Sequence, residues 1–458
     1  MNSLNKISNI SLINFTFALF PLSVILGNLA INVNIIIFIG LGSFILLKNK
    51  LYAKQNFLIS VLGILFLFIV FSSIYNLILN YELKDVRHVY KSSLIKSLLF
   101  FRYFIFVIIF IVLTKHNILN IKYFLIPVFL LTYFLVFDIF FQDIFGFDVF
   151  GLQNESPNDN SGFFGKELIA GGFLQKFSLA SIFLTGYLLR NKKKYLSIFI
   201  ALSIILFGAA ILLTTNRISI FLFLLGIFLF MCISKNNKKI IFFSFSIVIL
   251  IFGLLLKYDY STNLKYRSFF GSVNGMIQYT IIKSNNSIKE TLNKNVKVAP
   301  LDPIFYKKGS GHLELFRAAG NTFKENPVFG HGMKNFFQSC ININGKLYKL
   351  GTPIDCNSHP HNYYFEILSS LGVLGILIFL FFMIHLYRDF FLFSFQKFEN
   401  FKDLNSVVYN FSLLTLVVEF FPLRSSGSFF STYNSFLIFL FIALMLGTKK
   451  VRSTKYES

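Results

Sequence analysis

The sequence has little charge, no tryptophan and only three cysteines. Charged residues make up 14% of the 458 residues, against about 25% in soluble globular proteins. This shortage excludes a water-soluble enzyme with an ordinary surface, and the 55% content of hydrophobic residues excludes a disordered chain. The composition therefore predicts a polytopic membrane protein.

Motifs for nucleotides and metals are also missing. GxxxxGKS/T, GxGxxG after a strand, DxD and HExxH do not occur, and no CxxC or His/Cys cluster suggests zinc. We therefore expect no cofactor and no metal, and any reaction of this chain must use a pre-activated substrate.

Acidic residues are few: 20 Asp and Glu stand against 43 Lys and Arg, a formal charge of +23. Such an excess is one sign of nucleic-acid binding. In a membrane protein we expect lipid headgroups or a phosphorylated lipid as the anionic partner instead, and no nucleic acid. The alternative is that many of these lysines only set the topology.

Twelve apolar stretches are predicted to be transmembrane helices, since about 20 apolar residues cross the hydrocarbon core. Helices satisfy their backbone polar groups in lipid without closing a barrel, so we predict an all-α fold. The first two stretches divide near Gly27–Asn34. The predicted spans are 9–30, 31–47, 57–78, 97–114, 123–141, 167–190, 195–214, 218–234, 240–256, 362–387, 406–422 and 433–447.

Lysines and arginines in short loops predict the orientation. With the N-terminus in the cytoplasm, the inner segments hold 20 of them and the short outer loops hold 7. An even number of spans then places both termini in the cytoplasm. We divide the chain into helices 1–9 (1–256), a large periplasmic loop with amphipathic helices (257–361), and helices 10–12 with a short tail (362–458).

The large loop is polar, and loops of this length are usually functional. It holds Cys340 and Cys356, which could form a disulfide in an oxidising compartment, but their spacing alone leaves this open.

Two arginines are candidates for binding an anion. Arg217 lies at the outer turn between two apolar helices, where it either anchors an anionic headgroup or only reaches the interface. Arg317 lies on a predicted amphipathic helix that ends at Asn326-Pro327 and is followed by a Gly330-His331-Gly332 turn. A surface pair with Glu314 is the alternative role for Arg317. Guanidinium groups suit phosphate because they stay charged and bind it bidentately.

His359, His361 and Asn362 stand directly before a long apolar helix. A histidine at a helix N-terminus is disfavoured as imidazolium, which favours a neutral ring that can act as a base. A structural, hydrogen-bonded His361 is the alternative.

Further polar residues stand near the outer face. Glu366 lies one turn into the same helix, where it could orient His361 or Asn362, or pair with an arginine. Lys176 lies inside the 167–190 span and could face a headgroup cavity, and Arg424 flanks the last outer turn. Ionisable residues at membrane depth are functional candidates by default.

Together, these pieces resemble the O-antigen ligase and O-antigen polymerase superfamily. The resemblance is carried by the segment Asp138 to Gly151 with Ser161-Gly162-Phe163, by Asn216-Arg217, by Arg317 through Gly332, and by His361-Asn362 leading to Gly372 and Gly375. The order of these motifs and the long loop before the His-Asn helix make the match specific, and it is strongest from about 138 to 380.

The resemblance implies a metal-independent glycosyltransferase. Its donor would be an undecaprenyl-diphosphate-linked glycan, and its acceptor a lipid A-core sugar or another carrier-linked glycan. Arg217 and Arg317 would hold the diphosphate, and His361, or less readily His359, would activate the acceptor hydroxyl. One position departs from the family, because Ser370 stands where a glutamate is frequent.

Two other functions compete with ligation. A repeat-unit polymerase shares the same motifs. A lipid-linked glycan transporter would fit twelve spans, but the sparse charges at mid-depth, the absence of a visible internal repeat and the large one-sided loop are against it.

Overall fold

The computed structural model describes most of the chain. The described residues are 2–52, 56–82, 84–153, 159–165, 169–260, 262–263, 265–267, 311–348, 356–396, 401, 403–424 and 427–449. The middle of the predicted periplasmic loop, residues 268–310, lies outside them. Within the described residues there is no strand, only an isolated antiparallel bridge between Phe147 and Gln153, so the all-α class is confirmed.

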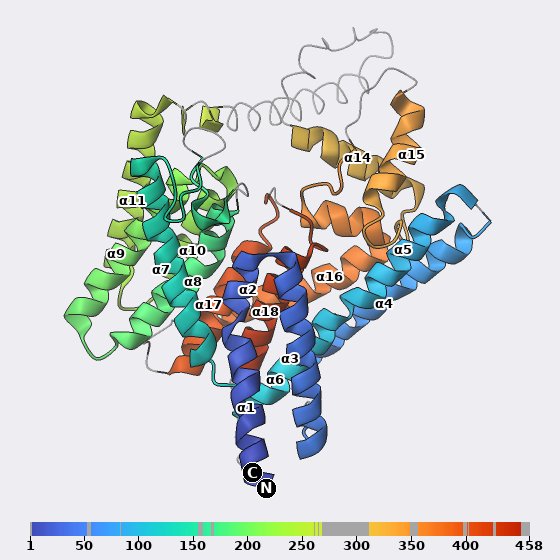
Figure 1. The fold of residues 1–458 in the computed structure, drawn as a ribbon. Helices are drawn as coiled ribbons and strands as arrows, with labels where there is room; N and C mark the ends of the chain where they lie inside the picture. The colour runs from blue at the N-terminus through green and yellow to red at the C-terminus, as the bar shows by residue number, and fades with distance from the viewer. Residues whose placement is uncertain are drawn as a thin grey trace.

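The helices are numbered here as in Figure 1. In chain order they are α1 (Asn2–Ala18), α2 (Phe20–Leu26), α3 (Asn28–Asn49), α4 (Phe57–Leu79), α5 (Lys84–Phe100), α6 (Arg102–Lys115), α7 (Lys122–Phe145), the 3₁₀ helix η1 (Gly162–Phe164), α8 (Ala170–Leu188), α9 (Lys193–Leu213), α10 (Arg217–Ile233), α11 (Lys238–Tyr258), α14 (Gly311–Glu325), α15 (Phe336–Tyr348), α16 (Tyr363–Gln396), α17 (Leu404–Glu419) and α18 (Thr432–Thr448).

The described helices confirm a multi-pass membrane protein but not the count of twelve spans. Seven helices are long and apolar enough to cross a membrane, or eight if the bent pair α1–α2 counts as one. The other predicted stretches are helical too, but α10, α17 and α18 have only 16 or 17 residues, fewer than the roughly 20 that span a bilayer. In α8 the polar Gln175 and Lys176 interrupt the apolar sequence.

The first two spans divide at Gly27, whose φ of 95° stops α2, within the predicted interval Gly27–Asn34. One boundary differs from the prediction. The predicted span 97–114 begins much earlier, because α5 and α6 together form a 29-residue candidate span, Arg87–Lys115. The lysines of α5 gave the appearance of a loop, but a lysine on a membrane helix can extend its amine to the interface.

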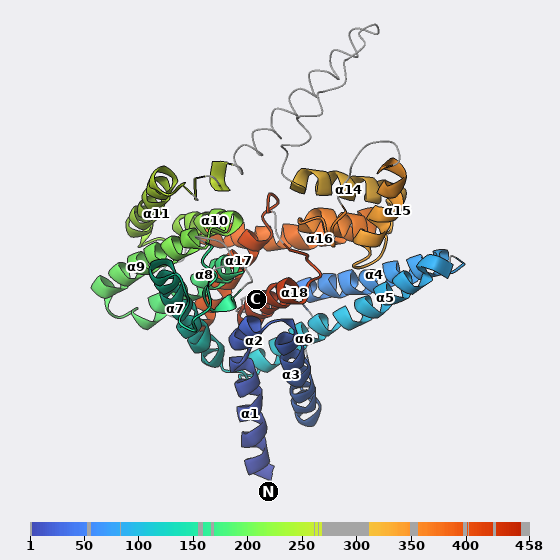
Figure 2. The same ribbon diagram turned by 45° about the horizontal axis from the view of Figure 1, so that its top comes forward.

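The helices form two groups with a buried centre between them (Figure 1). Helices α7 to α11 lie on one side, and α4, α5 and α16 on the other. Between them, α18 is buried at every residue from Asn434 to Thr448, as suits a helix that is apolar all round. Helices α14 and α15 pack on α16, at the end of the molecule opposite the start of α1 (Figure 2).

A turn between α14 and α15, residues 327–332, docks against a kink in α16. Gly372 has a φ of 68° inside α16. The backbone N–H groups of His331 and Gly332 donate to the carbonyls of Ser369 and Ser370 at 3.1 and 2.8 Å. In return, the N–H of Val373 donates to the Pro327 carbonyl at 2.7 Å. The kink frees backbone groups of α16, and the turn satisfies them.

Helix α4 holds the same turn from the other side. The Ser72 hydroxyl donates to the Phe329 carbonyl at 2.7 Å, and the Asn76 side chain donates to the Gly330 carbonyl at 2.9 Å. Both side chains are almost fully buried. The predicted Gly-His-Gly turn is therefore a structural joint between α4, α14 and α16.

We predict that Gly372→Ala destabilises the protein by about 2 kcal/mol or more. Its φ is positive, and an added Cβ would collide with the backbone of Val328 and Gly330. The midpoint of thermal unfolding in detergent measures the loss. Gly253→Ala on α11 is the matched control, because its Cβ would meet nothing within 4 Å. Equal midpoints for the two variants would contradict this account of the joint.

Candidate functional site

Asn362 connects the start of α16 to the segment that follows α17. Its side-chain oxygen caps the helix by accepting from the Tyr364 N–H at 2.9 Å, as Asn does at helix N-termini. Its amide nitrogen donates to the carbonyls of Pro422 and Arg424 at 2.9 and 3.0 Å. A buried Asn362 therefore fixes the residues on both sides of it, His361 included.

A buried ion cluster lies beside this connection. Lys176 of α8 and Arg424 both pair with the Glu419 carboxylate at the end of α17, Lys176 at 3.8 Å. The Tyr363 hydroxyl donates to the other carboxylate oxygen at 2.9 Å. None of the three charged side chains is more than 7% exposed. Lys176 thus contacts Glu419, and buried charges of this kind persist only when paired.

The carboxylate of Glu366 binds the segment before α18, whereas the sequence suggested His361, Asn362 or an arginine as its partner. Its carboxylate accepts from the Ser428 hydroxyl at 2.5 Å and from the Phe429 N–H at 2.6 Å. The carboxylate therefore anchors the turn before α18, and Glu366 bonds to Asn362 only through its backbone N–H, which donates to the Asn362 carbonyl at 2.9 Å. Glu366 is 3% exposed, so this bonding satisfies a carboxylate that lies inside the protein.

The two histidines lie against each other. The ring centroids of His359 and His361 are 4.2 Å apart. The Asn357 amide lies 3.3 Å from Nε2 of His361, and His361 has a φ of 54°. Burial lowers the pKa of His359 to about 4, with a further contribution from the neighbouring His361. A neutral His359 therefore stands beside the His361 ring at neutral pH.

A disulfide joins Cys340 of α15 to Cys356, with the Cα atoms 5.8 Å apart. The pairing that the sequence left open is therefore present. It ties the segment before the histidines to a small apolar cluster formed by Ala318, Ala319, Phe336 and Cys340.

The predicted helix around Arg317 is confirmed as α14. Phe316 stacks on Phe365 of α16 with centroids 4.9 Å apart. This contact places α14 over the first turns of α16, and with it the half-buried Arg317. Neither the resemblance nor the spacing predicted the ring contact.

Arg217 is exposed at the first turn of α10, and its guanidinium donates to the Lys265 carbonyl at 3.2 Å. Phe221 lies one turn later on the same face, and its ring centroid is 5.7 Å from that of Phe421. Arg217 therefore lies near the segment between α17 and Arg424, but it is exposed and is not part of the buried ion cluster.

Residues 201–380 match the family described as O-antigen ligase. The match covers 180 of the 458 residues. The resemblance drawn from the motifs is thus confirmed. A comparison with curated proteins found no match.

The matched residues contain Arg217, Arg317 and both histidines, together with Asn362 and Glu366. Lys176 and Arg424 lie outside the matched residues. Both pair with Glu419, which in turn accepts a hydrogen bond from Tyr363 inside them. Sequence reasoning did not select Glu419 or Tyr363 as site residues. A signal was present, because Glu419 is an isolated carboxylate within an apolar stretch, where a charge needs a partner.

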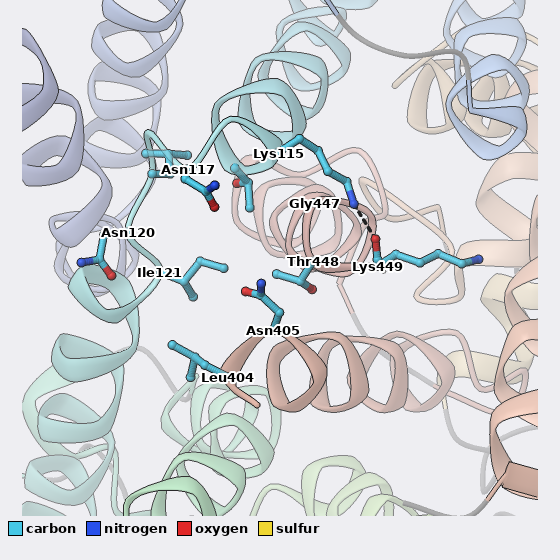
Figure 3. A pocket seen from close by; sticks show the side chains of 11 residues that line it. Lys115, Asn117, Asn120, Ile121, Leu404, Asn405, Gly447, Thr448 and Lys449 are labelled. Atoms are coloured by element: carbon cyan, nitrogen blue, oxygen red, sulfur yellow. Dashed lines mark hydrogen bonds between the residues drawn. The ribbon is translucent and has the colours of Figure 1, made fainter. Parts of the chain in front are cut away.

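A pocket of about 390 Å³ lies far from the O-antigen ligase motifs. Lys115, Asn117, Asn405 and Thr448 are among the residues around it (Figure 3). It lies where α6 and α18 end and where α7 and α17 begin, at the end predicted to be cytoplasmic. It is therefore not the candidate site of the matched residues. Among the described residues, no group of three or more His, Cys, Asp or Glu side chains could hold a metal.

We predict that Glu419→Ala destabilises the protein by about 3–5 kcal/mol, since it leaves two buried cations without their carboxylate. Lys176→Met should cost much less, because the pair of Glu419 and Arg424 stays intact. Chemical denaturation of the purified variants in detergent measures both. A Lys176→Met variant as unstable as Glu419→Ala would show that Glu419 is not the centre of the cluster.

We also predict an acid-dependent contribution of His359 to stability. Its pKa is lowered in the folded protein, so below about pH 6.5 the unfolded chain takes up a proton that the fold excludes. Stability is then lost as the pH falls from about 6.5 through about 4. Wild type should lose more thermal stability than His359→Gln between pH 7 and 4.5. Parallel curves would contradict the buried, neutral ring.

Proposed function

We propose that this protein transfers a glycan from an undecaprenyl-diphosphate carrier to an acceptor sugar of the lipid A-core, at the periplasmic face of the inner membrane. The match of residues 201–380 to the O-antigen ligase family carries the proposal. That segment includes Arg217, Arg317 and His361, and these residues belong to elements at one end of the fold.

Glycosyl transfer from a diphosphate gives each of the three residues a role. Arg217 and Arg317 hold the diphosphate and stabilise the charge that develops on it as the bond to the anomeric carbon breaks. His361 takes the proton of the acceptor hydroxyl as that oxygen attacks. Direct displacement inverts the anomeric carbon and releases the carrier diphosphate. No metal and no cofactor take part in these steps.

The surroundings of the histidines support this division of work. Asn362 fixes the backbone next to His361 through bonds to Pro422 and Arg424, and the disulfide holds the other side of the segment. Holding the base in place favours fast transfer, because even small errors in the position of a catalytic group lower the rate. Lys176, His359, Glu366 and Arg424 would complete the substrate-binding region.

The proposed orientation places both termini in the cytoplasm. The basic residues Lys115 and Lys449 lie together at the end opposite α14 and α15, as expected for the cytoplasmic side. The lipid tail of the donor would enter between helices, with its glycan under the loop 257–361.

Deletion cells test the proposal. Cells that lack the gene receive wild type, Arg217→Ala, Arg317→Ala or His361→Ala at matched membrane levels. Lipopolysaccharide is resolved on gels, and carrier-linked glycan is assayed in parallel. Long chains that build up on the carrier above a bare core support ligation. Single repeats that accumulate and reach the core as one unit indicate a polymerase, and a deletion that changes neither contradicts both.

We predict that Arg217→Ala and Arg317→Ala each lower transfer about 10²–10³-fold, and that His361→Ala lowers it about 10²–10⁴-fold. His385→Ala on α16 is the control for the histidine. That ring is half-buried, hydrogen-bonds to the Phe381 carbonyl at 2.9 Å and packs on Phe57 of α4, away from the candidate site residues. Arg190→Ala, at the far end of α8, controls for the arginines. Wild-type glycan from all three site variants would refute the assignment.

A further inference from the structure

A second group of cations gathers on the opposite side of α16 from α14. Lys96 on α5, Arg102 at the start of α6 and Lys334 after the docked turn come from three separate segments. Figure 2 shows α14 and α5 on opposite faces of α16, with α4 between α16 and α5. Lys96 lies just before the predicted span 97–114, and the sequence indicated no role for the other two.

The docked turn places Lys96 and Lys334 side by side. The Ser93 hydroxyl of α5 donates to the Met333 carbonyl at 2.8 Å, and Ser93 is almost fully buried. Lys96 follows Ser93 by one helical turn and so lies on the same face of α5. Lys334 follows Met333 directly, and both lysines are exposed.

Arg102 lies one to two turns further along the same span. Its guanidinium bends back toward the start of the helix, donating to the Leu99 carbonyl at 2.6 Å and to the Asn32 side chain at 2.9 Å. Its Nε atom is buried and has no hydrogen-bond partner among the described residues. Such an unused buried donor is unusual in a folded protein; the rest of the guanidinium is held in place, since it also donates to the Tyr103 hydroxyl at 3.0 Å.

The charges of this group do not balance. Lys334 interacts electrostatically with Glu366, Lys96 and Arg102. Glu366 is the one carboxylate among these partners, and it already accepts from Ser428 and Phe429. Desolvation lowers the pKa of Lys334, Glu366 opposes this, and Lys96 and Arg102 lower the pKa further. Glu366 is buried and already hydrogen-bonded, so the positive charge of the two exposed lysines is available to an anion.

The site is open to lipid. Ile95, Leu98 and Leu99 of α5 are 55–60% exposed, as on a face that touches acyl chains. Lys96 is exposed on this stretch of α5, and Arg102 follows at the start of α6. Basic pockets between membrane helices bind phosphorylated headgroups, and lysine and arginine are the side chains that hold phosphate.

We infer that Lys96, Arg102 and Lys334 form a phosphate site for a membrane lipid, separate from the pair Arg217 and Arg317. This inference rests on the proposed function in one respect: it assigns the site to the acceptor, because the donor diphosphate is given to the other pair. The ligand is a lipid-borne phosphate or diphosphate, whose source is either lipid A or a second polyprenyl carrier.

Binding to the full-length protein in nanodiscs tests the site. Native mass spectrometry measures the binding of three probes: lipid A, undecaprenyl diphosphate and phosphatidylglycerol. The double variant Lys96→Gln with Lys334→Gln removes two exposed amines with little risk to the fold. Lys91→Gln is the matched control, because this exposed lysine lies on α5 about 140° around the helix from Lys96.

We predict that the double variant binds lipid A or undecaprenyl diphosphate at least about tenfold more weakly, since each lysine contributes about a factor of five near an anionic headgroup. Whichever probe weakens identifies the source. Lys91→Gln should bind as wild type does. Unchanged binding of both probes overturns the inference. An equal loss for phosphatidylglycerol also overturns it, because it would show a general anionic surface.

The two proposals fail separately. If binding depends on Lys96 and Lys334 while glycan transfer ignores Arg217, Arg317 and His361, the phosphate site stands and the proposed function does not. If transfer depends on those three residues and lipid binding ignores the lysines, only the phosphate site is wrong.

Discussion

Burying the Glu419 carboxylate among apolar helices costs free energy that only accompanying cations and donors can offset. Lys176 comes from α8, Tyr363 from α16 and Arg424 from the segment after α17. One carboxylate thus requires three elements to meet at a fixed place. Asn362 and the histidine pair adjoin that place along the chain, so the position of the candidate site follows from the way this charge is neutralised.

The segment that matches the O-antigen ligase family is held in part by residues outside it. Residues 327–333 accept hydrogen bonds from Ser72 and Asn76 of α4 and from Ser93 of α5, all of which lie outside residues 201–380. The matched segment contains the kinked joint and most of the candidate site residues. Earlier helices of the chain supply the hydrogen bonds that position this joint.

Much of the fold could be predicted from periodicity and apolar length. Every predicted span is helical, and α14 and its ending at Asn326-Pro327 were expected. Local patterns could not reveal the kink at Gly372, because its stability depends on a turn some 40 residues earlier. The pairing of Lys176 with Glu419 joins residues 243 positions apart, a contact that no local pattern encodes. The lysines of α5 were read as a loop because charge was given more weight than helical continuity.

The hydrogen bonds between α4 and the docked turn have a consequence for the synthesis and membrane insertion of the protein. Ser72 finds the Phe329 carbonyl only after 257 further residues have been made. At about 5–20 residues per second, this takes on the order of tens of seconds. Throughout that time Asn76 resides in a new membrane helix without its final partner. The early helices must therefore pack without these hydrogen bonds at first. They reach their final arrangement only after the turn at residues 327–332 has been synthesised.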